Sequence, residues 1–321
     1  MRDTNWFADD GWGVFCHYLT SPKTTADEWN RQVDAFDVAG LARQLASVNA
    51  AYFFITVGQG SGHYCAPNDT YDAIAGVRPS KCSRRDLISD LYQALHPMGI
   101  DLLVYAPADG SNADPDARKG LKLSAHWHEA KDFNWKPGAH WGQFRLPEFQ
   151  RNWEEICRDW ALRWGRKIRG WWIDGAYVPD VRYPENETPN FKSFTEALRA
   201  GNPDAIVAFN CGVSTPVKHY TQYEDYTAGE LNEPFEVLPT SRWVEGAQWH
   251  ALTFLGSAWA SRDTRHPTER WVRWVGAVAE KGGAVTLDLG PNWDPASGPI
   301  GALSDAQVAQ FKAIRQALPG E

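Results

Sequence analysis

One carboxylate in the sequence is flanked by residues that favour a catalytic role. Asp174 follows the apolar run Trp171-Trp-Ile173 and precedes Gly175, so it lies where a predicted strand opens into a loop. A carboxylate at the end of a buried strand is suited to act as a nucleophile or a general base. The structural alternative is an Asp that caps the next helix or pairs with an Arg. We expect Asp174 to lie at the centre of a catalytic site.

A second carboxyl group is required if the chemistry is the cleavage of a glycosidic bond. The two groups stand roughly 5 Å apart in enzymes that retain the configuration of the sugar, and somewhat further apart in enzymes that invert it. Glu230, in the segment Tyr226-Thr-Ala-Gly-Glu-Leu-Asn-Glu233, is the first candidate for the general acid/base, and Glu233 and Glu245 are its rivals. Each of them, taken alone, is more often a solvated surface residue.

Polar and aromatic side chains also stand at or near the other predicted strand ends. Those that we expect to contact a substrate are His17, Gln59, Tyr105, Trp172, Asn210 and Trp259. No Ser-His-Asp arrangement and no cluster of metal ligands is evident in this set. The pair His126 and His128 is spaced like two chelating residues on a strand, but a third ligand is missing, and a surface loop is the better interpretation. We therefore expect no metal ion and no organic cofactor.

The elements that must position these residues alternate between short apolar runs and longer amphipathic stretches. Continuous apolar runs are typical of parallel strands buried on both faces. Strands are predicted at residues 13–19, 52–58, 101–107, 169–175, 205–211, 225–229, 251–256 and 284–290, and helices at 36–49, 83–96, 147–166, 189–200, 267–281 and 304–318. Eight strands with intervening helices predict a single (β/α)8 TIM barrel over residues 1–321.

A doubly wound sheet is the competing architecture for this alternation. It would usually carry a Gly-rich phosphate-binding turn after its first strand, whereas the first strand here ends in His17-Tyr-Leu-Thr-Ser21. Two connections are unusually long, residues 107–148 and 212–249. Both follow the carboxyl end of a predicted strand, which is the end where barrel enzymes build their active sites.

Composition excludes several classes of partner. The net charge of −8 argues against nucleic acid, and no run of about 18 apolar residues is present that could span a membrane. The 17 Trp suit both a large core and the stacking faces of a carbohydrate site, and we assign most of them to the core. The five scattered Cys predict free, mostly buried thiols. No signal peptide is visible, which favours a cytoplasmic location, although a mature secreted form would look the same.

Several of these segments, in this order, resemble the α-L-fucosidases of glycoside hydrolase family 29. The family's Gly-x-Phe-x-His-Trp strand is similar to Gly13-Val-Phe-Cys-His-Tyr18, and its Trp-x-Asp-Gly nucleophile motif matches Trp172-Ile-Asp-Gly175. Its third strand ends in Tyr-Tyr-Ser, similar to Val104-Tyr-Ala106. Its last strand, Gly-Gly-Asn-x-Leu-Leu-Asn-x-Gly-Pro, resembles Gly282-Gly-Ala-Val-Thr-Leu-Asp-Leu-Gly-Pro291. The Lys-His-His-Asp-Gly-Phe signature of its second strand corresponds to Thr56-Val-Gly-Gln-Gly-Ser-Gly-His63.

The resemblance implies a retaining glycoside hydrolase without a cofactor, in which Asp174 forms a covalent glycosyl-enzyme intermediate and Glu230 is the acid/base. The family's C-terminal β-sandwich has no counterpart in residues 1–321. Gln59 and Gly60 replace the paired His that the family uses on the fucose hydroxyls, so the substrate is expected to be an α-L-fucoside or a related deoxy or modified sugar. Two alternatives remain: a carbohydrate-binding protein that has lost activity on the same scaffold, and a barrel isomerase or lyase.

Overall fold

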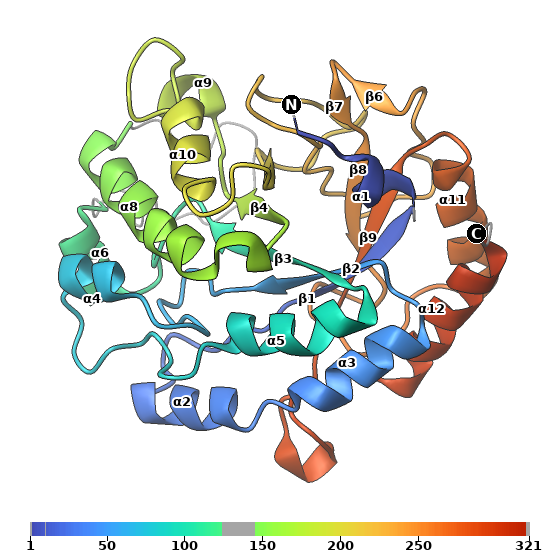
Figure 1. Ribbon diagram of the computed structural model, residues 1–321, viewed down its shortest axis with the longest axis horizontal. Helices are drawn as coiled ribbons and strands as arrows, with labels where there is room; N and C mark the ends of the chain where they lie inside the picture. Colours follow the sequence, from blue (N-terminus) through green and yellow to red (C-terminus); the bar gives the residue numbers. More distant parts are fainter. Residues whose placement is uncertain (1, 10, 124–144, 319–321) are drawn as a thin grey trace.

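The computed structural model describes residues 2–9, 11–123 and 145–318, which leaves His126 and His128 outside the described residues. Seven parallel strands form one curled sheet in the order β5-β4-β3-β2-β1-β9-β8, with helices around its outer side (Figure 1). The first and the last strands along the chain, β1 and β9, pair directly with each other, with Val14 opposite Leu287. This pairing brings the two ends of the chain together, as the barrel prediction requires.

The strands of the curled sheet agree with the predicted apolar runs but are shorter. They are β1 (Trp12–Cys16), β2 (Tyr52–Thr56), β3 (Asp101–Pro107), β4 (Gly170–Asp174), β5 (Ile206–Phe209), β8 (His250–Phe254) and β9 (Ala284–Leu289). Apart from Asp101 at the start of β3 and Asp174 at the end of β4, the residues of these strands are buried. Burial on both faces explains why the strands are continuously hydrophobic. A separate antiparallel hairpin is formed by β6 (Trp243–Val244) and β7 (Ala247–Gln248).

The predicted sixth strand is an irregular segment between β5 and β8. Residues 225–231 form isolated parallel bridges with β7 and β8, at Tyr226 opposite Gln248 and at Glu230 opposite Leu252. One backbone hydrogen bond joins the segment to β5, from Asp225 N–H to the Val207 carbonyl at 2.9 Å. The segment therefore lies in the gap of the sheet without continuing the strand pairing on both sides.

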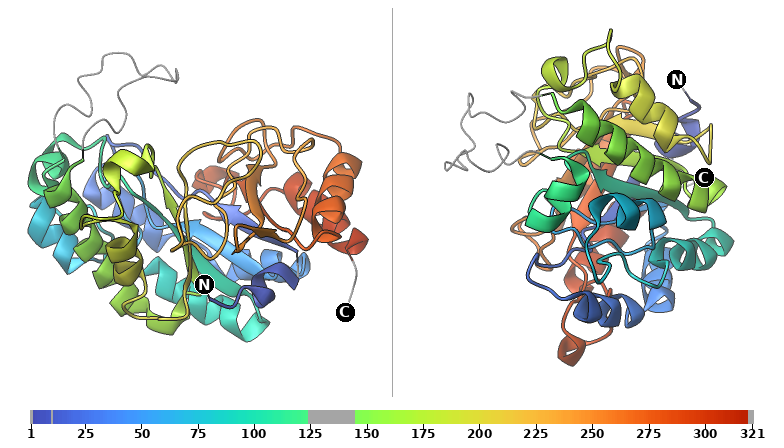
Figure 2. Two further views of the ribbon diagram at one scale, coloured as in Figure 1. Left: turned by 90° about the horizontal axis from the view of Figure 1, so that it is seen from above. Right: turned by 90° about the vertical axis from the view of Figure 1, so that its left-hand side faces the viewer.

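The helices pack mainly against the outer face of the sheet (Figure 2). Ser304 accepts a hydrogen bond as the N-cap of the last helix, and Pro147 begins the longest one, both as predicted. The helices are α1 (Asn5–Asp9), α2 (Ala26–Asp34), α3 (Val38–Ser47), α4 (Asp69–Ala75), α5 (Leu87–Leu95), α6 (Pro115–Leu121), α8 (Pro147–Trp164), α9 (Pro179–Arg182), α10 (Phe191–Leu198), α11 (Thr268–Ala279) and α12 (Asp305–Ala317). Between α10 and α11, a stretch described without a gap, the chain forms no helix.

Two apolar cores lie on opposite sides of the sheet. The larger one fills the space between the strands and the helices. The smaller one fills the inside of the curled sheet and includes Phe15, Phe54, Tyr105, Trp172 and Leu252. Successive residues of a strand point to opposite faces, so His17, Asp174, Asn210 and Asp288 continue the inward rows at the carboxyl ends of their strands. The alternation along the strands therefore places these four polar side chains together on the inner face, at the carboxyl end of the sheet.

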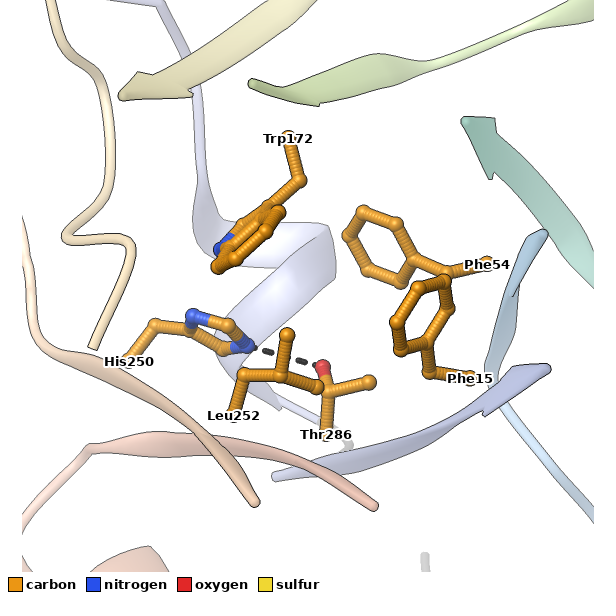
Figure 3. Close-up of a pocket in the computed structure, with 6 residues that line it drawn as sticks. All are labelled: Phe15, Phe54, Trp172, His250, Leu252 and Thr286. Carbon is orange, nitrogen blue, oxygen red and sulfur yellow. Dashed lines mark hydrogen bonds between the residues drawn. The ribbon is translucent and has the colours of Figure 1, made fainter. Parts of the chain in front are cut away.

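The amino-terminal end of the curled sheet is closed by apolar side chains. Phe7 of α1 is fully buried and packs against Tyr52, Tyr226 and His250, with ring centroids 4.6 to 5.2 Å apart. Above it lies a narrow void that holds no room for a water molecule, lined by Phe15, Phe54, Trp172, His250, Leu252 and Thr286 (Figure 3). This end of the barrel interior is packed and offers no binding cavity.

Two further expectations concern the whole chain. All five Cys are free and four of them are buried, as the sequence predicts. Among the described residues, no helix is both long enough and apolar enough to cross a membrane.

Candidate active site

The carboxylates of Asp174 and Glu230 converge on one amide group. Nδ2 of Asn210 donates hydrogen bonds to Oδ1 of Asp174 at 2.8 Å and to Oε2 of Glu230 at 2.6 Å. The two acceptor oxygens therefore cannot be further apart than the sum of these distances, about 5.4 Å. Asp174 ends β4, Asn210 directly follows β5, and Glu230 lies on the irregular segment. Two neighbouring strands and the segment that follows them along the chain therefore build this arrangement.

The second oxygen of Asp174 is held by a hydrogen-bond chain that begins at Gln59, in the loop after β2. The hydroxyl of Tyr105 donates to Oδ2 of Asp174 at 2.6 Å, and Nε2 of Gln59 donates to the Tyr105 hydroxyl at 2.5 Å. Burial and the neighbouring Asp174 raise the pKa of Tyr105, so its hydroxyl keeps its proton and can only donate to the carboxylate. Both oxygens of Asp174 thus accept hydrogen bonds from fixed donors.

Glu230 lies in an environment that favours its protonated form. Burial and the negative charge of Asp174 raise the pKa of Glu230, the hydrogen bond from Asn210 and the nearby His17 lower it, and the net pKa is about 7. The two carboxyl groups therefore differ in character near neutral pH. Asp174 is surrounded by hydrogen-bond donors, whereas Glu230 can hold a proton to give to a neighbouring atom.

The two rival glutamates lie on the surface. Glu233 is 74% exposed and forms an ion pair with Arg265 at 3.4 Å, and Glu245 is 79% exposed and lies 3.5 Å from Nδ1 of His219. Neither shares a hydrogen-bond donor with Asp174. Of the three candidates for the second carboxyl group, the structure brings Glu230 to Asp174.

His17 and Trp259 flank the carboxylate pair on its other side. Their rings meet edge to face, with centroids 5.7 Å apart, and His17 also lies 5.9 Å from the Tyr105 ring. Nδ1 of His17 is 2.6 Å from Oδ1 of Asp288, a fully buried residue of β9. Asp288 escaped the sequence analysis because it stands inside an apolar strand, 271 positions from its partner. A lone charged residue within such a run was the available clue.

Trp172 lies below the carboxylates and is only 4% exposed. Its ring stacks on Tyr105 at a centroid distance of 5.5 Å, and its indole N–H donates to the Ala228 carbonyl. Trp172 thus supports Tyr105 and the irregular segment from inside the barrel. The expected contact between Trp172 and a substrate stays a prediction, as do those of His17, Gln59, Tyr105, Asn210 and Trp259.

Three more residues of this region, Asp109, Arg182 and Tyr177, are not among the site residues predicted from the sequence. Asp109, after β3, forms a buried ion pair of 2.6 Å with Arg182 of α9, and Arg182 also donates to the Gly175 carbonyl. These contacts tie together the loops that follow β3 and β4. Burial raises the pKa of Tyr177, and the negative charges of Asp174 and Glu230 raise it further.

The donor set of this region is unsuited to a metal ion. Within residues 2–9, 11–123 and 145–318, no group of three or more His, Cys, Asp or Glu side chains is arranged to hold one. The arrangement instead offers two carboxyl groups joined by one shared amide, of which Glu230 can carry a proton. Such a pair can combine nucleophilic attack with proton transfer.

Comparison with solved structures identifies proteins of the same fold. An endo-fucoidan hydrolase from glycoside hydrolase family 107 superimposes with a TM-score of 0.74 at 18% sequence identity, over 99% of this chain and 55% of that one. The chain thus spans about half the length of that enzyme. A second endo-fucoidan hydrolase of the same family gives a TM-score of 0.70 at 14% identity, over 98% of this chain and 93% of that one.

The family 29 barrel named in the sequence analysis is also found. An α-L-fucosidase of family 29 from Bacteroides thetaiotaomicron has a TM-score of 0.63 at 16% identity, over 98% of this chain and 74% of that one. That enzyme is described as a covalent intermediate trapped with 2-fluoro-fucosyl fluoride in a Glu→Gln variant. No model of a protein family and no curated protein matches the sequence. The comparisons therefore show a fucosidase-type barrel fold.

Proposed function

We propose that the protein is a retaining glycoside hydrolase with Asp174 as the nucleophile and Glu230 as the general acid/base. The observation that carries the proposal is the shared amide of Asn210, which limits the contacted oxygens of the two carboxylates to a separation of about 5.4 Å. Retaining enzymes place their carboxyl groups about 5–5.5 Å apart, whereas inverting enzymes need about 6.5–9.5 Å to admit a water molecule. The spacing supports a covalent glycosyl-enzyme intermediate.

In the first half of the proposed reaction, Asp174 attacks the anomeric carbon while Glu230 gives its proton to the leaving oxygen. The bond from the anomeric carbon to the leaving group breaks, and an ester bond to Asp174 forms. The Tyr105 hydroxyl and the Asn210 amide orient the attacking carboxylate through its two oxygens. The raised pKa of Glu230, about 7, keeps a useful fraction of this group protonated at neutral pH.

In the second half, Glu230 has lost its proton and acts as a base. It removes a proton from a water molecule that attacks the anomeric carbon and releases Asp174. Once Asp174 is esterified it carries no charge, so its contribution to the raised pKa of Glu230 disappears, although burial still raises that pKa, and the group stays ionised more readily. The same pair therefore changes roles without a further catalytic residue.

The proposed substrate is an α-L-fucoside or a related deoxy or modified sugar. The likeness in fold to fucoidan hydrolases and fucosidases supports this class, together with the Trp-x-Asp-Gly motif around Asp174. We also propose that residues 1–321 form one catalytic (β/α)8 domain, in which residues 225–231 take the place of the sixth strand. Its partner is a carbohydrate, and no nucleic acid, membrane or cofactor is required.

The test is chemical rescue of the nucleophile variant. With an aryl α-L-fucoside, the variant Asp174→Gly should lose at least about 10³-fold in kcat, and added azide should restore turnover and yield a glycosyl azide. The matched control is Asp180→Gly, at an exposed Asp six positions further on, and it should keep wild-type turnover. Full activity of Asp174→Gly would refute the nucleophile assignment. Sugar binding by the wild type without any product over a broad panel of glycosides would favour the inactive carbohydrate-binding protein.

A further inference from the structure

Asp288 is a buried carboxylate that accepts hydrogen bonds from two parts of the candidate site. Its side chain is fully buried in β9, where it lies between Phe15 of β1 and Phe254 of β8. Oδ1 contacts Nδ1 of His17 at 2.6 Å, and Oδ2 accepts the backbone N–H of Ala260 at 2.8 Å. A buried charge without partners is costly, so both contacts are needed to keep this carboxylate inside the sheet.

The carboxylate determines which nitrogen of His17 carries a proton. An ionised Asp can only accept hydrogen bonds, so Nδ1 of His17 must be the protonated nitrogen. In the neutral ring Nε2 then carries a lone pair, on the side of the ring opposite to Asp288. Among the described residues, Nδ1 is the ring nitrogen of His17 that has a hydrogen-bond partner, which leaves Nε2 for a bound molecule.

The same carboxylate fixes the loop that carries Trp259. Ala260 has a φ of +63°, a left-handed conformation that is unfavourable for a residue with a Cβ, and its N–H points to Asp288. A Cβ at Gly290 would meet the Ala260 carbonyl oxygen at 1.7 Å, so only glycine allows the loop to approach β9 so closely. His17 and Trp259, both expected to contact the substrate, are therefore held by one buried side chain.

We propose that Asp288 is a positioning residue that holds His17 as an acceptor for a sugar hydroxyl and keeps Trp259 beside it. The inference deepens the proposed glycoside hydrolase function and rests on it for the identity of the ligand. Its specific content is the direction of the hydrogen bond: the hydroxyl donates and Nε2 of His17 accepts. A sugar that lacks this hydroxyl, or carries a methyl group on it, loses the contact and is discriminated against.

The variant Asp288→Asn separates the two contacts of this carboxylate. The amide oxygen can still accept the Ala260 N–H, but the amide nitrogen can only donate to His17. Nδ1 of His17 must then be the unprotonated nitrogen, and Nε2 becomes a donor. The loop is retained while the direction of the hydrogen bond to the sugar is reversed, a change that a merely structural role of Asp288 would not produce.

The experiment is nitrogen NMR of the protein with ¹⁵N-labelled histidine, in which the variant His17→Gln identifies the His17 signals by their loss. In the neutral ring of the wild type we expect Nδ1 to carry the proton and Nε2 to be unprotonated. Asp288→Asn should exchange the two assignments in the neutral ring. Asp86→Asn is the matched control, because Asp86 caps α5 and Asn preserves that cap. It should leave the His17 signals unchanged.

Two outcomes would overturn the inference: a neutral His17 in the wild type with its proton on Nε2, or the same tautomer in the wild type and in Asp288→Asn. Since the wild-type measurement needs only the assignment variant His17→Gln, the test holds even if Asp288→Asn fails to fold. The tautomer is read in the free protein, so it is independent of turnover. The activity arm predicts that Asp288→Asn lowers kcat/KM about 10- to 100-fold, mainly through KM. Correct tautomers without turnover of any glycoside would refute the hydrolase proposal alone.

Discussion

The two ends of the barrel interior are built from the same strands but have opposite chemistry. At the amino-terminal end, Phe7, Tyr52 and Phe54 pack closely. Both ring nitrogens of His250 are hydrogen-bonded there, to the Thr227 carbonyl and to the Thr286 hydroxyl, and Figure 3 draws the second of these bonds. At the carboxyl end, Asp174 and Glu230 share one amide, and Nε2 of His17 is left to a bound molecule.

The difference shows how burial is used in each place. Burial lowers the pKa of His250 to about 4, so this ring is neutral at physiological pH and serves packing. Burial raises the pKa of Glu230 to about 7, which places its titration in the range where proton transfer is useful. At the amino-terminal end the buried ring is neutral and packs against its neighbours, whereas at the carboxyl end the burial of Glu230 costs stability once this group is ionised.

The largest effect is expected at the carboxyl end, from the variant Glu230→Gln. It should lower kcat on substrates with poor leaving groups about 10²- to 10⁴-fold, since the proton donor is lost. The free energy of unfolding of this variant should rise at neutral and higher pH, although its activity falls. The raised folded-state pKa stabilises the protein below the unfolded value near 4.5, and this contribution is lost as the pH rises through about 7. Above pH 7, the variant should therefore be more stable than the wild type, on the order of 1–3 kcal/mol.

The matched control for this variant is Glu233→Gln, three positions further on the same segment. Glu233 is exposed and pairs with Arg265, so its change should leave both kcat and the free energy of unfolding nearly unchanged. Aryl glycoside kinetics and urea unfolding at pH 6 and pH 8 measure the two quantities. Equal losses of activity in the two variants would contradict the assignment of Glu230.

The next effect is expected at the amino-terminal end, from Phe7→Ala. Removing this fully buried ring from the closed end of the barrel should lower the free energy of unfolding by about 3–5 kcal/mol. kcat/KM per folded molecule should stay within about threefold of wild type, because Phe7 packs at the opposite end from the carboxylates. Trp6→Ala, at the partly exposed neighbouring position, is the control and should cost much less. A large loss of kcat with unchanged stability would remove the distinction between the two ends.

The pH dependence of kcat/KM sharpens the comparison at the carboxyl end. The acid form of Glu230 is required, so kcat/KM should fall above about pH 7, about tenfold per pH unit. The Asn210 hydrogen bond lowers the pKa of Glu230, so Asn210→Ala should move this limb of the profile to higher pH. The test is to measure kcat/KM against pH for the wild type and for Asn210→Ala with one aryl glycoside. A limb that moves to lower pH in Asn210→Ala would contradict the proposed environment of Glu230.

The smallest effect is expected from Thr286→Val at the amino-terminal end. Val has nearly the same shape as Thr but cannot donate to Nε2 of His250, which then lacks its partner at 2.8 Å. Thermal or urea unfolding should show a loss of about 1–2 kcal/mol. The tautomer of His250 should not change, because the Thr227 carbonyl still accepts from Nδ1. A gain in stability would mean that the polar pair is dispensable for this core.

The sequence predicts the regular parts of this molecule better than the irregular ones. Apolar runs located β1, β4 and β9, and position at a strand end singled out Asp174 and Asn210. Residues 225–229 were predicted as a strand, but this part of the chain pairs only at isolated bridges because Gly229, with a φ of +59°, turns the chain between Tyr226 and Glu230. Sequence spacing could not choose among Glu230, Glu233 and Glu245, since only the fold shows which one reaches Asp174.

Long-range pairing is the other kind of information that local patterns lack. The link from Gln59 through Tyr105 to Asp174 joins three strands, and the link from His17 to Asp288 joins the first strand to the last. In the sequence each of these residues is an isolated polar position. Short helices such as α4 and α6 also escaped the prediction, because seven residues are too few to show a clear helical period.

The shared amide of Asn210 also bears on how the protein would age. Deamidation turns an asparagine into an aspartate when the next backbone nitrogen attacks the side-chain carbonyl, and here it would place a third carboxyl group between two others. Asn210 is 1% exposed, its nitrogen contacts both carboxylates, and its oxygen accepts the N–H of Gly212 at 3.1 Å. These contacts hold the side chain and hinder the attack by the Cys211 nitrogen. The network that sets the spacing of the carboxylates thus also protects the one neutral group between them from slow chemical damage.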